Sequence, residues 1–230
     1  MKLIQFLKRE WLQILILAVP FIAAALVWDQ LPDRVPNHWN ICGEVDGYAG
    51  KIFGTLFLPI LTIGMMILFA FIPRLDPKCR NYDDETKASI ARVFRICRLA
   101  ISLFMTVLAL TILAFALHWH VNVCRVIVAG LGMLFIVMGN SMGKLRPNYF
   151  AGFRTPWTLE SKTVWLKTHR LGGFLMVLSG LLLIVEDGFL TFFQIFFAGL
   201  IPLIVLVGFV PLIYSYILHR AETKNSGPAH

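Results

Sequence analysis

One stretch of the sequence, residues 139–170, concentrates side chains that could bind a charged ligand. It carries six basic residues against the single acid Glu160, and aromatic side chains alternate with the charges. The basic residues are Lys144, Arg146, Arg154, Lys162, Lys167 and Arg170, and the aromatic residues are Tyr149, Phe150, Phe153, Trp157 and Trp165. Because a guanidinium group binds phosphate or carboxylate through two parallel hydrogen bonds, we expect the three arginines to converge on such a group.

The glycines, prolines and hydroxyl residues of this stretch predict how it folds. Gly139 and Gly143 form a small-x-x-x-small pair, which favours close packing against another helix. Pro147 and Pro156 indicate a folded loop rather than a helix. Thr158 is expected to cap the next helix. Four residues at a spacing of four positions are predicted to share one face of that helix: Ser161, Trp165, His169 and Gly173.

The candidate binding residues of this stretch combine hydrogen-bond donors, bases and aromatic rings. They are Asn140, Gly143, Lys144, Arg146, Pro147, Asn148, Tyr149, Gly152, Arg154, Thr155, Pro156, Trp157, Trp165, His169 and Arg170. The alternative interpretation is a loop that only anchors the neighbouring helices, because basic and aromatic residues are routine at a membrane surface.

A second stretch, residues 29–52, is mildly acidic and rich in turn-forming residues. Its two prolines and three glycines indicate a compact structure, and Asp46-Gly47 is a turn dipeptide expected at the tip of a hairpin. His38, Glu44 and Asp46 could form a metal or acid–base cluster, but they show no known ligand spacing. We therefore assign no metal ligands.

Membrane-spanning helices must position these two stretches. The mean hydropathy is +0.74 and 58% of the residues are hydrophobic, more than in a soluble domain. The apolar runs are continuous rather than alternating, which excludes a barrel. Six are long enough to cross a hydrocarbon core of about 30 Å, so the predicted fold class is an all-α integral membrane protein with six transmembrane helices. The predicted spans are 11–28, 53–73, 96–117, 121–140, 169–186 and 190–217.

The basic residues predict the orientation of the chain. The N-terminus, the 74–98 connector, the 139–170 connector and the tail hold 18 of the 21 basic residues, and only Arg34, Lys51 and Arg125 lie on the opposite side. The positive-inside rule therefore places both termini and the 139–170 loop in the cytoplasm. Because topology accounts for the net charge of +8, the charge gives no reason to expect direct nucleic-acid binding.

Chemistry within the membrane is not indicated. The span cores hold no Asp, Glu, Lys or Arg, whereas ion- or proton-coupled carriers usually need such residues. Arg98 and two arginines preceding it lie where the third span enters the membrane, and we expect them to anchor to lipid headgroups. The sequence has no H-E-x-x-H, G-x-S-x-G, Walker or dinucleotide motif, and its four cysteines form no paired spacing. We predict no catalytic residue and no cofactor.

Two long motifs resemble a known family. Met142-Gly143-Lys144, Arg146-Pro147-Asn148-Tyr149-Phe150, Gly152-Phe153-Arg154-Thr155-Pro156-Trp157-Thr158-Leu159 and Val164-Trp165 with Lys167-Thr168-His169-Arg170-Leu171-Gly172-Gly173 are similar to the signature of the SdpI immunity-protein family of bacteria. The segment Pro36-x-His38-Trp39-Asn40-x-x-Gly43-x-x-Asp46-Gly47-Tyr48-x-x-Lys51 resembles the extracytoplasmic module that begins many of those proteins. Phe153 departs from the aliphatic residue more common in the family.

The resemblance implies a multi-pass protein of the bacterial plasma membrane that protects its host from a secreted peptide toxin. It also implies a receptor that draws a soluble autorepressor to the membrane when toxin is present. By position, the 139–170 loop would face that repressor. The toxin-sensing residues would be His38, Trp39, Asn40, Gly43, Asp46, Gly47, Tyr48 and Lys51. The predicted units are an N-terminal two-span module (1–95), a four-span module (96–220) and a flexible tail (221–230).

A second hypothesis concerns membrane lipids as partners. Arg146, Arg154, His169 and Arg170 could act on a lipid headgroup, which would make the protein an enzyme or a lipid-handling protein. The absence of a nucleophile or metal signature in the sequence places this reading second.

Overall fold

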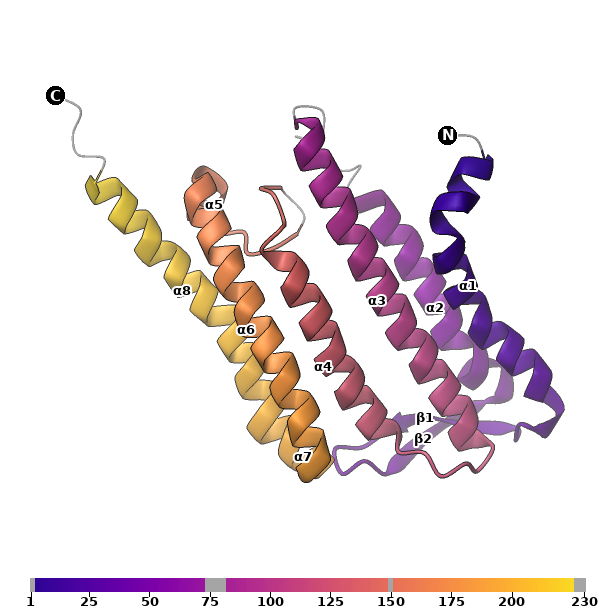
Figure 1. Cartoon of the computed structure of the whole chain (residues 1–230). Helices are drawn as coiled ribbons and strands as arrows, with labels where there is room; N and C mark the ends of the chain where they lie inside the picture. The colour runs from indigo at the N-terminus through magenta and orange to yellow at the C-terminus, as the bar shows by residue number, and fades with distance from the viewer. Residues whose placement is uncertain (1–2, 73–81, 149–150, 226–230) are drawn as a thin grey trace.

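The computed structural model describes residues 3–72, 82–148 and 151–225. Within these residues six helical segments are long and apolar enough to cross a membrane, which confirms the predicted all-α multi-pass fold (Figure 1). The long helices are α1 (Leu3–Val27), α2 (Lys51–Phe71), α3 (Asp84–Ala116), α4 (Val123–Met142), α6 (Lys162–Phe189) and α8 (Ile201–Asn225). A short helix α5 (Pro156–Glu160) precedes α6, and α7 (Phe192–Gln194) with a π-helical segment (Ile195–Leu200) precedes α8.

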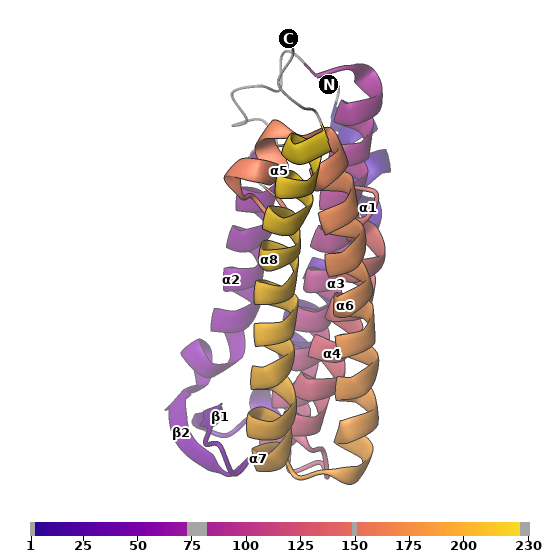
Figure 2. The same ribbon diagram turned by 90° about the vertical axis from the view of Figure 1, so that its left-hand side faces the viewer.

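The long helices run side by side, and two views define the ends of the bundle (Figures 1 and 2). The start of α1, the end of α8 and α5 lie at one end, here called the inner end. The strands β1 and β2 and helix α7 lie at the other, the outer end. The described parts of the segments that carry most of the basic residues, at the starts of α1 and α3, around α5 and at the end of α8, thus lie at the inner end.

Glycine contacts make α4 and α6 the most closely packed helix pair. A Cβ added at Gly139 would lie 2.6 Å from the carbonyl oxygen of Gly173, and one added at Gly132 would lie 2.8 Å from that of Gly180. Only glycine permits such a close backbone approach. We call this contact between α4 and α6 the glycine seam. On α4 it is formed by Gly132 and Gly139, and not by the predicted Gly143, whose added Cβ would lie 3.8 Å from the Arg170 Cα.

Polar side chains join α1 to α3. Arg98 donates to Glu10 over 3.0 Å, Gln13 donates to Ser102, and Thr106 donates to the Ile16 carbonyl over 3.0 Å. The ion pair is largely buried, with 15% and 11% of the two side chains exposed. Arg98 thus binds a carboxylate inside the protein instead of the predicted lipid headgroup, because α1 presents an acid at the same depth.

The outer stretch folds into the antiparallel hairpin of β1 (Arg34–Trp39) and β2 (Val45–Gly50). Its tip is formed by Asn40, whose side-chain oxygen accepts from the N–H groups of Cys42 and Glu44, both over 2.9 Å, and by Gly43 at φ +84°. Asp46-Gly47 lies within β2, so the predicted tip was misplaced. The Asn40 side chain supplies the turn bonds, and Gly43 takes the positive φ that favours glycine.

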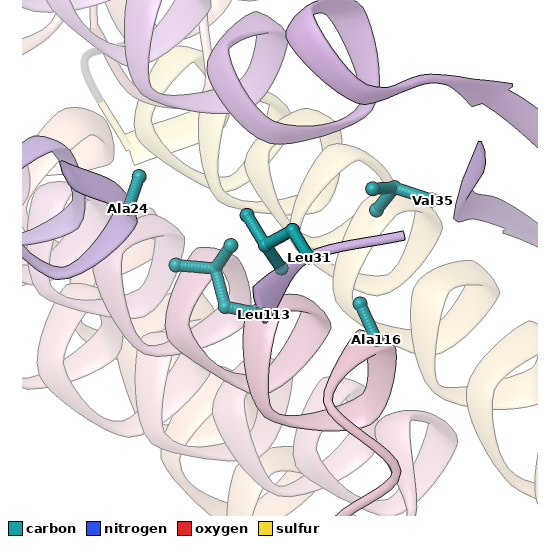
Figure 3. Close-up of a cluster of buried hydrophobic side chains, with 5 residues drawn as sticks. All are labelled: Ala24, Leu31, Val35, Leu113 and Ala116. Atoms are coloured by element: carbon teal, nitrogen blue, oxygen red, sulfur yellow. The ribbon is translucent and has the colours of Figure 1, made fainter. Parts of the chain in front are cut away.

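A buried apolar cluster fixes the hairpin to the helices. Ala24 of α1, Leu31, Val35 of β1, and Leu113 and Ala116 of α3 pack together at the outer end (Figure 3). Val35 is fully buried, so this residue determines which face of the hairpin packs against the helices. The hairpin is therefore part of the folded body rather than a loose loop.

Helix ends extend the predicted spans beyond the apolar runs. Helix α3 begins at Asp84, and the Asp83 side chain caps it by accepting from the Thr86 N–H. Helix α8 continues through Asn225, into the segment predicted as a flexible tail. The π-helical segment ends at Leu200, two residues before Pro202, whose missing N–H and ring prevent regular α-helical bonding to the preceding turn.

Candidate functional site

A buried histidine organises the inner loop. His169 Nε2 accepts from the Phe153 N–H over 3.0 Å, and His169 Nδ1 lies 2.8 Å from the Trp165 carbonyl oxygen. Because the carbonyl only accepts, Nδ1 carries the proton and Nε2 is the acceptor. The imidazole also stacks on the Trp165 ring at a centroid distance of 4.0 Å. Both ring nitrogens are thus engaged within the protein.

Two further contacts close the loop onto α6. Trp165 is fully buried, and its indole N–H donates to the Leu145 carbonyl over 2.8 Å. Gly152 takes φ +101° directly against the His169 ring, where an added Cβ would collide with Nε2. Leu145, Gly152, Phe153, Trp165 and His169 together form what we call the inner clip.

The threonines of the loop form helix caps. Thr155 caps α5 by accepting from the Thr158 N–H, while Thr158 Oγ accepts from the Thr155 N–H over 2.9 Å. Helix α6 is capped by Ser161, so Thr158 is not the cap that the sequence predicted. The loop contains an additional turn of helix, because Pro156 fits the first helical position. Thr155 Oγ also lies 3.2 Å from Ser215 Oγ of α8.

Other predicted loop residues also bind the chain itself. Asn148 is buried, donates to the Arg146 carbonyl over 3.0 Å and accepts from the Ala151 N–H over 2.7 Å. The Trp157 ring lies 5.1 Å from that of Tyr216 in α8. Pro147 is half-buried. Tyr149 and Phe150 lie outside the described residues, as does Cys79, one of the four cysteines.

The arginines do not form the predicted cluster of three. Arg146 makes an ion pair with Glu85 of α3, which occupies the guanidinium group expected to join Arg154 and Arg170. The Lys144 carbonyl accepts from the Ser89 hydroxyl over 2.7 Å, so the loop is tied to α3 twice. Several residues of the predicted binding set are exposed at this end, together with two further lysines and the acid Glu160: Asn140, Gly143, Lys144, Gly152, Arg154, Pro156, Lys162, Lys167 and Arg170.

At the outer end the hairpin presents three exposed side chains of the predicted set. His38 Nδ1 lies 2.5 Å from Asp46 Oδ1 across the strands, and Tyr48 is 54% exposed. The other members are structural. Asn40 and Gly43 form the tip, and Gly47 leaves room for the His38 Cβ. The Lys51 ammonium lies 5.1 Å from the Trp28 ring centroid.

The acidic residues of the hairpin do not gather around a common centre. Glu44 accepts from the Asn40 amide over 3.2 Å, apart from the His38–Asp46 pair. Within the described ranges no group of three or more His, Cys, Asp or Glu side chains could hold a metal ion. The hairpin therefore offers a polar surface around the His38–Asp46 pair.

A pocket of about 360 Å³ lies beneath the hairpin. Trp39 of β1 forms part of its wall and packs edge-on against Phe115, with ring centroids 5.8 Å apart. Asn37 and His38 of β1 also line it, and the other lining residues come from four helices and include Phe57 of α2, Ile112 of α3, Ile127 of α4 and Phe192 of α7. Sequence reasoning missed these residues, because apolar side chains in a span look alike until packing shows which of them border a cavity.

The fold and the two sites define a multi-pass membrane protein with a structured outer hairpin and a clipped inner loop. The model of the SdpI/YfhL protein family matches residues 144–215, and that of a domain of unknown function (DUF1648) matches residues 15–63. The chain is 27% identical to "Immunity protein SdpI" of Bacillus subtilis (strain 168) over 183 residues, which cover 80% of this chain and 83% of the relative. These matches confirm the predicted resemblance to the SdpI family and identify a bacterial membrane protein. No solved structure matches the chain.

Proposed function

We propose that this protein confers immunity to a secreted antimicrobial peptide at the outer face of the membrane. The observation that carries the proposal is the similarity to an immunity protein over most of both chains. The structure adds a receptor surface, since the exposed His38 lines the pocket beneath the hairpin and contacts Asp46, and Tyr48 is exposed on the same hairpin. An apolar side chain of the peptide placed in that pocket would gain about 1.5–3 kcal/mol.

A survival assay tests this proposal. The protein is expressed in a toxin-sensitive bacterium that lacks its own immunity gene, and the cells are exposed to culture medium from a toxin-secreting strain. We expect protection by the wild type, and its loss in Trp39→Ala and Asp46→Ala at unchanged membrane levels. Asp29→Ala serves as the matched control, because Asp29 is an exposed acid of the same loop outside the hairpin. Equal survival with and without the wild-type protein would contradict immunity.

We further propose that the inner end binds a small cytoplasmic repressor when the outer site is occupied. The exposed basic residues around the inner clip offer a cationic surface, and the clip holds it in a fixed shape. The test is fractionation of cells that express a tagged repressor. It should move to the membrane on addition of toxin, and Lys167→Ala combined with Arg170→Ala should keep it soluble while survival stays normal. A repressor that remains soluble with the wild-type protein would refute signalling without affecting immunity.

The lipid-handling alternative has less support from the geometry. His169 uses both ring nitrogens inside the clip, and Arg146 is paired with Glu85. Neither group is presented to a headgroup in this arrangement. A specific phospholipid that copurifies with the wild type and is lost in Arg154→Ala would favour this alternative over the receptor.

A further inference from the structure

The two strands of the outer hairpin differ in how their edges are protected. In β1, Val35 and Pro36 are buried, and the strand packs on α2 and α3. Pro36 has no N–H, which blocks strand addition on that side. In β2 no residue is buried, and the strand Val45–Gly50 contains no proline or lysine, the residues that most often protect an edge. The free edge of β2 is therefore open to pairing.

The register shows which backbone groups this edge presents. The Lys51 N–H donates to the Asp33 carbonyl over 2.8 Å, which makes that pair a hydrogen-bonded one. Hydrogen-bonded and non-hydrogen-bonded pairs alternate in an antiparallel ladder. The pairs Arg34–Gly50 and Pro36–Tyr48 are then non-hydrogen-bonded, in agreement with the missing N–H of the proline. The N–H groups of Gly50 and Tyr48 and the C=O group of Tyr48 consequently point away from β1. The C=O group of Gly50 belongs to α2, because Gly50 is the N-cap of that helix and its carbonyl accepts the first intrahelical hydrogen bond.

Charge favours a cationic occupant for this edge. Asp46 contacts the His38 ring, and Glu44 is bonded to the neutral amide of Asn40. In the part of the chain that the structure describes, neither carboxylate has a lysine or arginine within ion-pair distance. A lysine or arginine side chain on an added strand would meet uncompensated negative charge at the start of β2.

A shallow apolar hollow continues from the end of the same strand. It has a volume of about 590 Å³, begins at Gly50 and runs along one side of the first turns of α2, which is a membrane-spanning helix. Phe53 and Phe57 line it and stack on each other with ring centroids 4.7 Å apart. A peptide that leaves the β2 edge would lie along this side of α2, with its apolar part at the membrane and its charged part at the hairpin.

We propose that the free edge of β2 binds an extended segment of a cationic peptide as a third strand. This inference rests on the proposed immunity function and names how the toxin is held: by main-chain hydrogen bonds to Tyr48 and Gly50. Strand addition gives affinity through the backbone, while side chains of the added strand supply the specificity. The ligand class is an extended peptide with lysine or arginine beside an apolar segment.

Gly50 allows a direct test of the main-chain bonds. Its φ of −60° is the value that proline requires, and an added Cβ has nothing within 4 Å. Gly50→Pro thus removes the outward N–H with little change in shape, and Gly50→Ala is the matched control that keeps it. The probe is a short synthetic peptide of alternating lysine and valine, titrated against the full-length protein in phosphatidylcholine nanodiscs.

We expect Gly50→Pro to weaken binding by about twofold to tenfold, the equivalent of one net hydrogen bond, and Gly50→Ala to bind like the wild type. A peptide N-methylated at alternate residues should bind the wild type more weakly by at least as much, which keeps the test valid should Gly50→Pro fold poorly. Equal binding of the methylated and unmethylated peptides, or no binding of the probe to the wild type, would overturn the proposal. In the survival assay, the toxin dose that kills Gly50→Pro cells should be about twofold to tenfold lower than for the wild type. An equal dose would exclude edge pairing and leave immunity intact, whereas an inactive wild type would exclude immunity itself.

Discussion

Replacing His169 by alanine measures whether the inner clip is structural. The change removes the acceptor of the Phe153 N–H and the stacking partner of Trp165. A buried N–H without a partner costs about 1–3 kcal/mol, and a lost stacked pair costs about 0.5–1.5 kcal/mol. The expected loss of stability is therefore about 2–4 kcal/mol. For a chain of this size that corresponds to a fall in Tm of about 5–15 °C.

The assay is thermal unfolding of the purified protein in detergent, followed by tryptophan fluorescence and by the fraction that stays monodisperse. Lys167→Ala, an exposed position of the same helix, is the control and should melt with the wild type. His169→Gln should recover part of the loss, because its amide oxygen can accept from the Phe153 N–H. A Tm of His169→Ala within about 2 °C of the wild type would refute the structural reading of the clip.

Three further predictions test other parts of the fold. Gly139→Ala should cost about 1–3 kcal/mol because its Cβ would lie 2.6 Å from a facing carbonyl, whereas Gly143→Ala should unfold like the wild type; equal Tm values would contradict the glycine seam. Arg98→Ala should lower the free energy of unfolding by about 3–5 kcal/mol, because it leaves the buried Glu10 carboxylate without its ion pair. Arg146→Ala should lower it by less than about 1 kcal/mol, because the Glu85 side chain is 73% exposed. Hydrogen bonds from Thr86 lower the pKa of the Asp83 carboxyl below its usual value of 3.8. The first turn of α3 should therefore be protected from amide exchange above pH 3.8 and lose this protection as the pH falls through the lowered pKa. Asp83→Asn should remove this pH dependence, and an unchanged pH profile in that variant would show that another group causes the loss of protection.

Local patterns in the sequence were sufficient for the architecture of the bundle. Six continuous apolar runs predicted the six spans, since backbone groups in a hydrocarbon core must bond within a helix. The uneven distribution of lysine and arginine predicted that both chain ends and the 139–170 loop share one end of the bundle. The four-residue spacing of Trp165, His169 and Gly173 correctly placed them on one buried face of α6.

Errors arose where a residue's role depended on a partner distant in the chain. Arg146 was expected to bind an external anion and instead pairs with Glu85, and Arg98 was expected at a lipid headgroup and instead pairs with Glu10. A charged side chain in a weakly polar surrounding binds the nearest opposite charge, and only the packing of α1 and α3 decides which one that is.

In the 139–170 stretch, too, the sequence predicted some features and only the tertiary structure decided others. Its residue types marked it as a folded segment, and its motifs carried the resemblance to the SdpI family that the matches confirm. Sequence alone did not show that Gly152, Trp165 and His169 contact one another. That outcome depends on the loop folding back over α6, where the Phe153 N–H and the Leu145 carbonyl reach the two rings. Tertiary contacts therefore made this stretch a scaffold and placed the pocket at the opposite end of the bundle, because a cavity exists only between elements that the chain brings together.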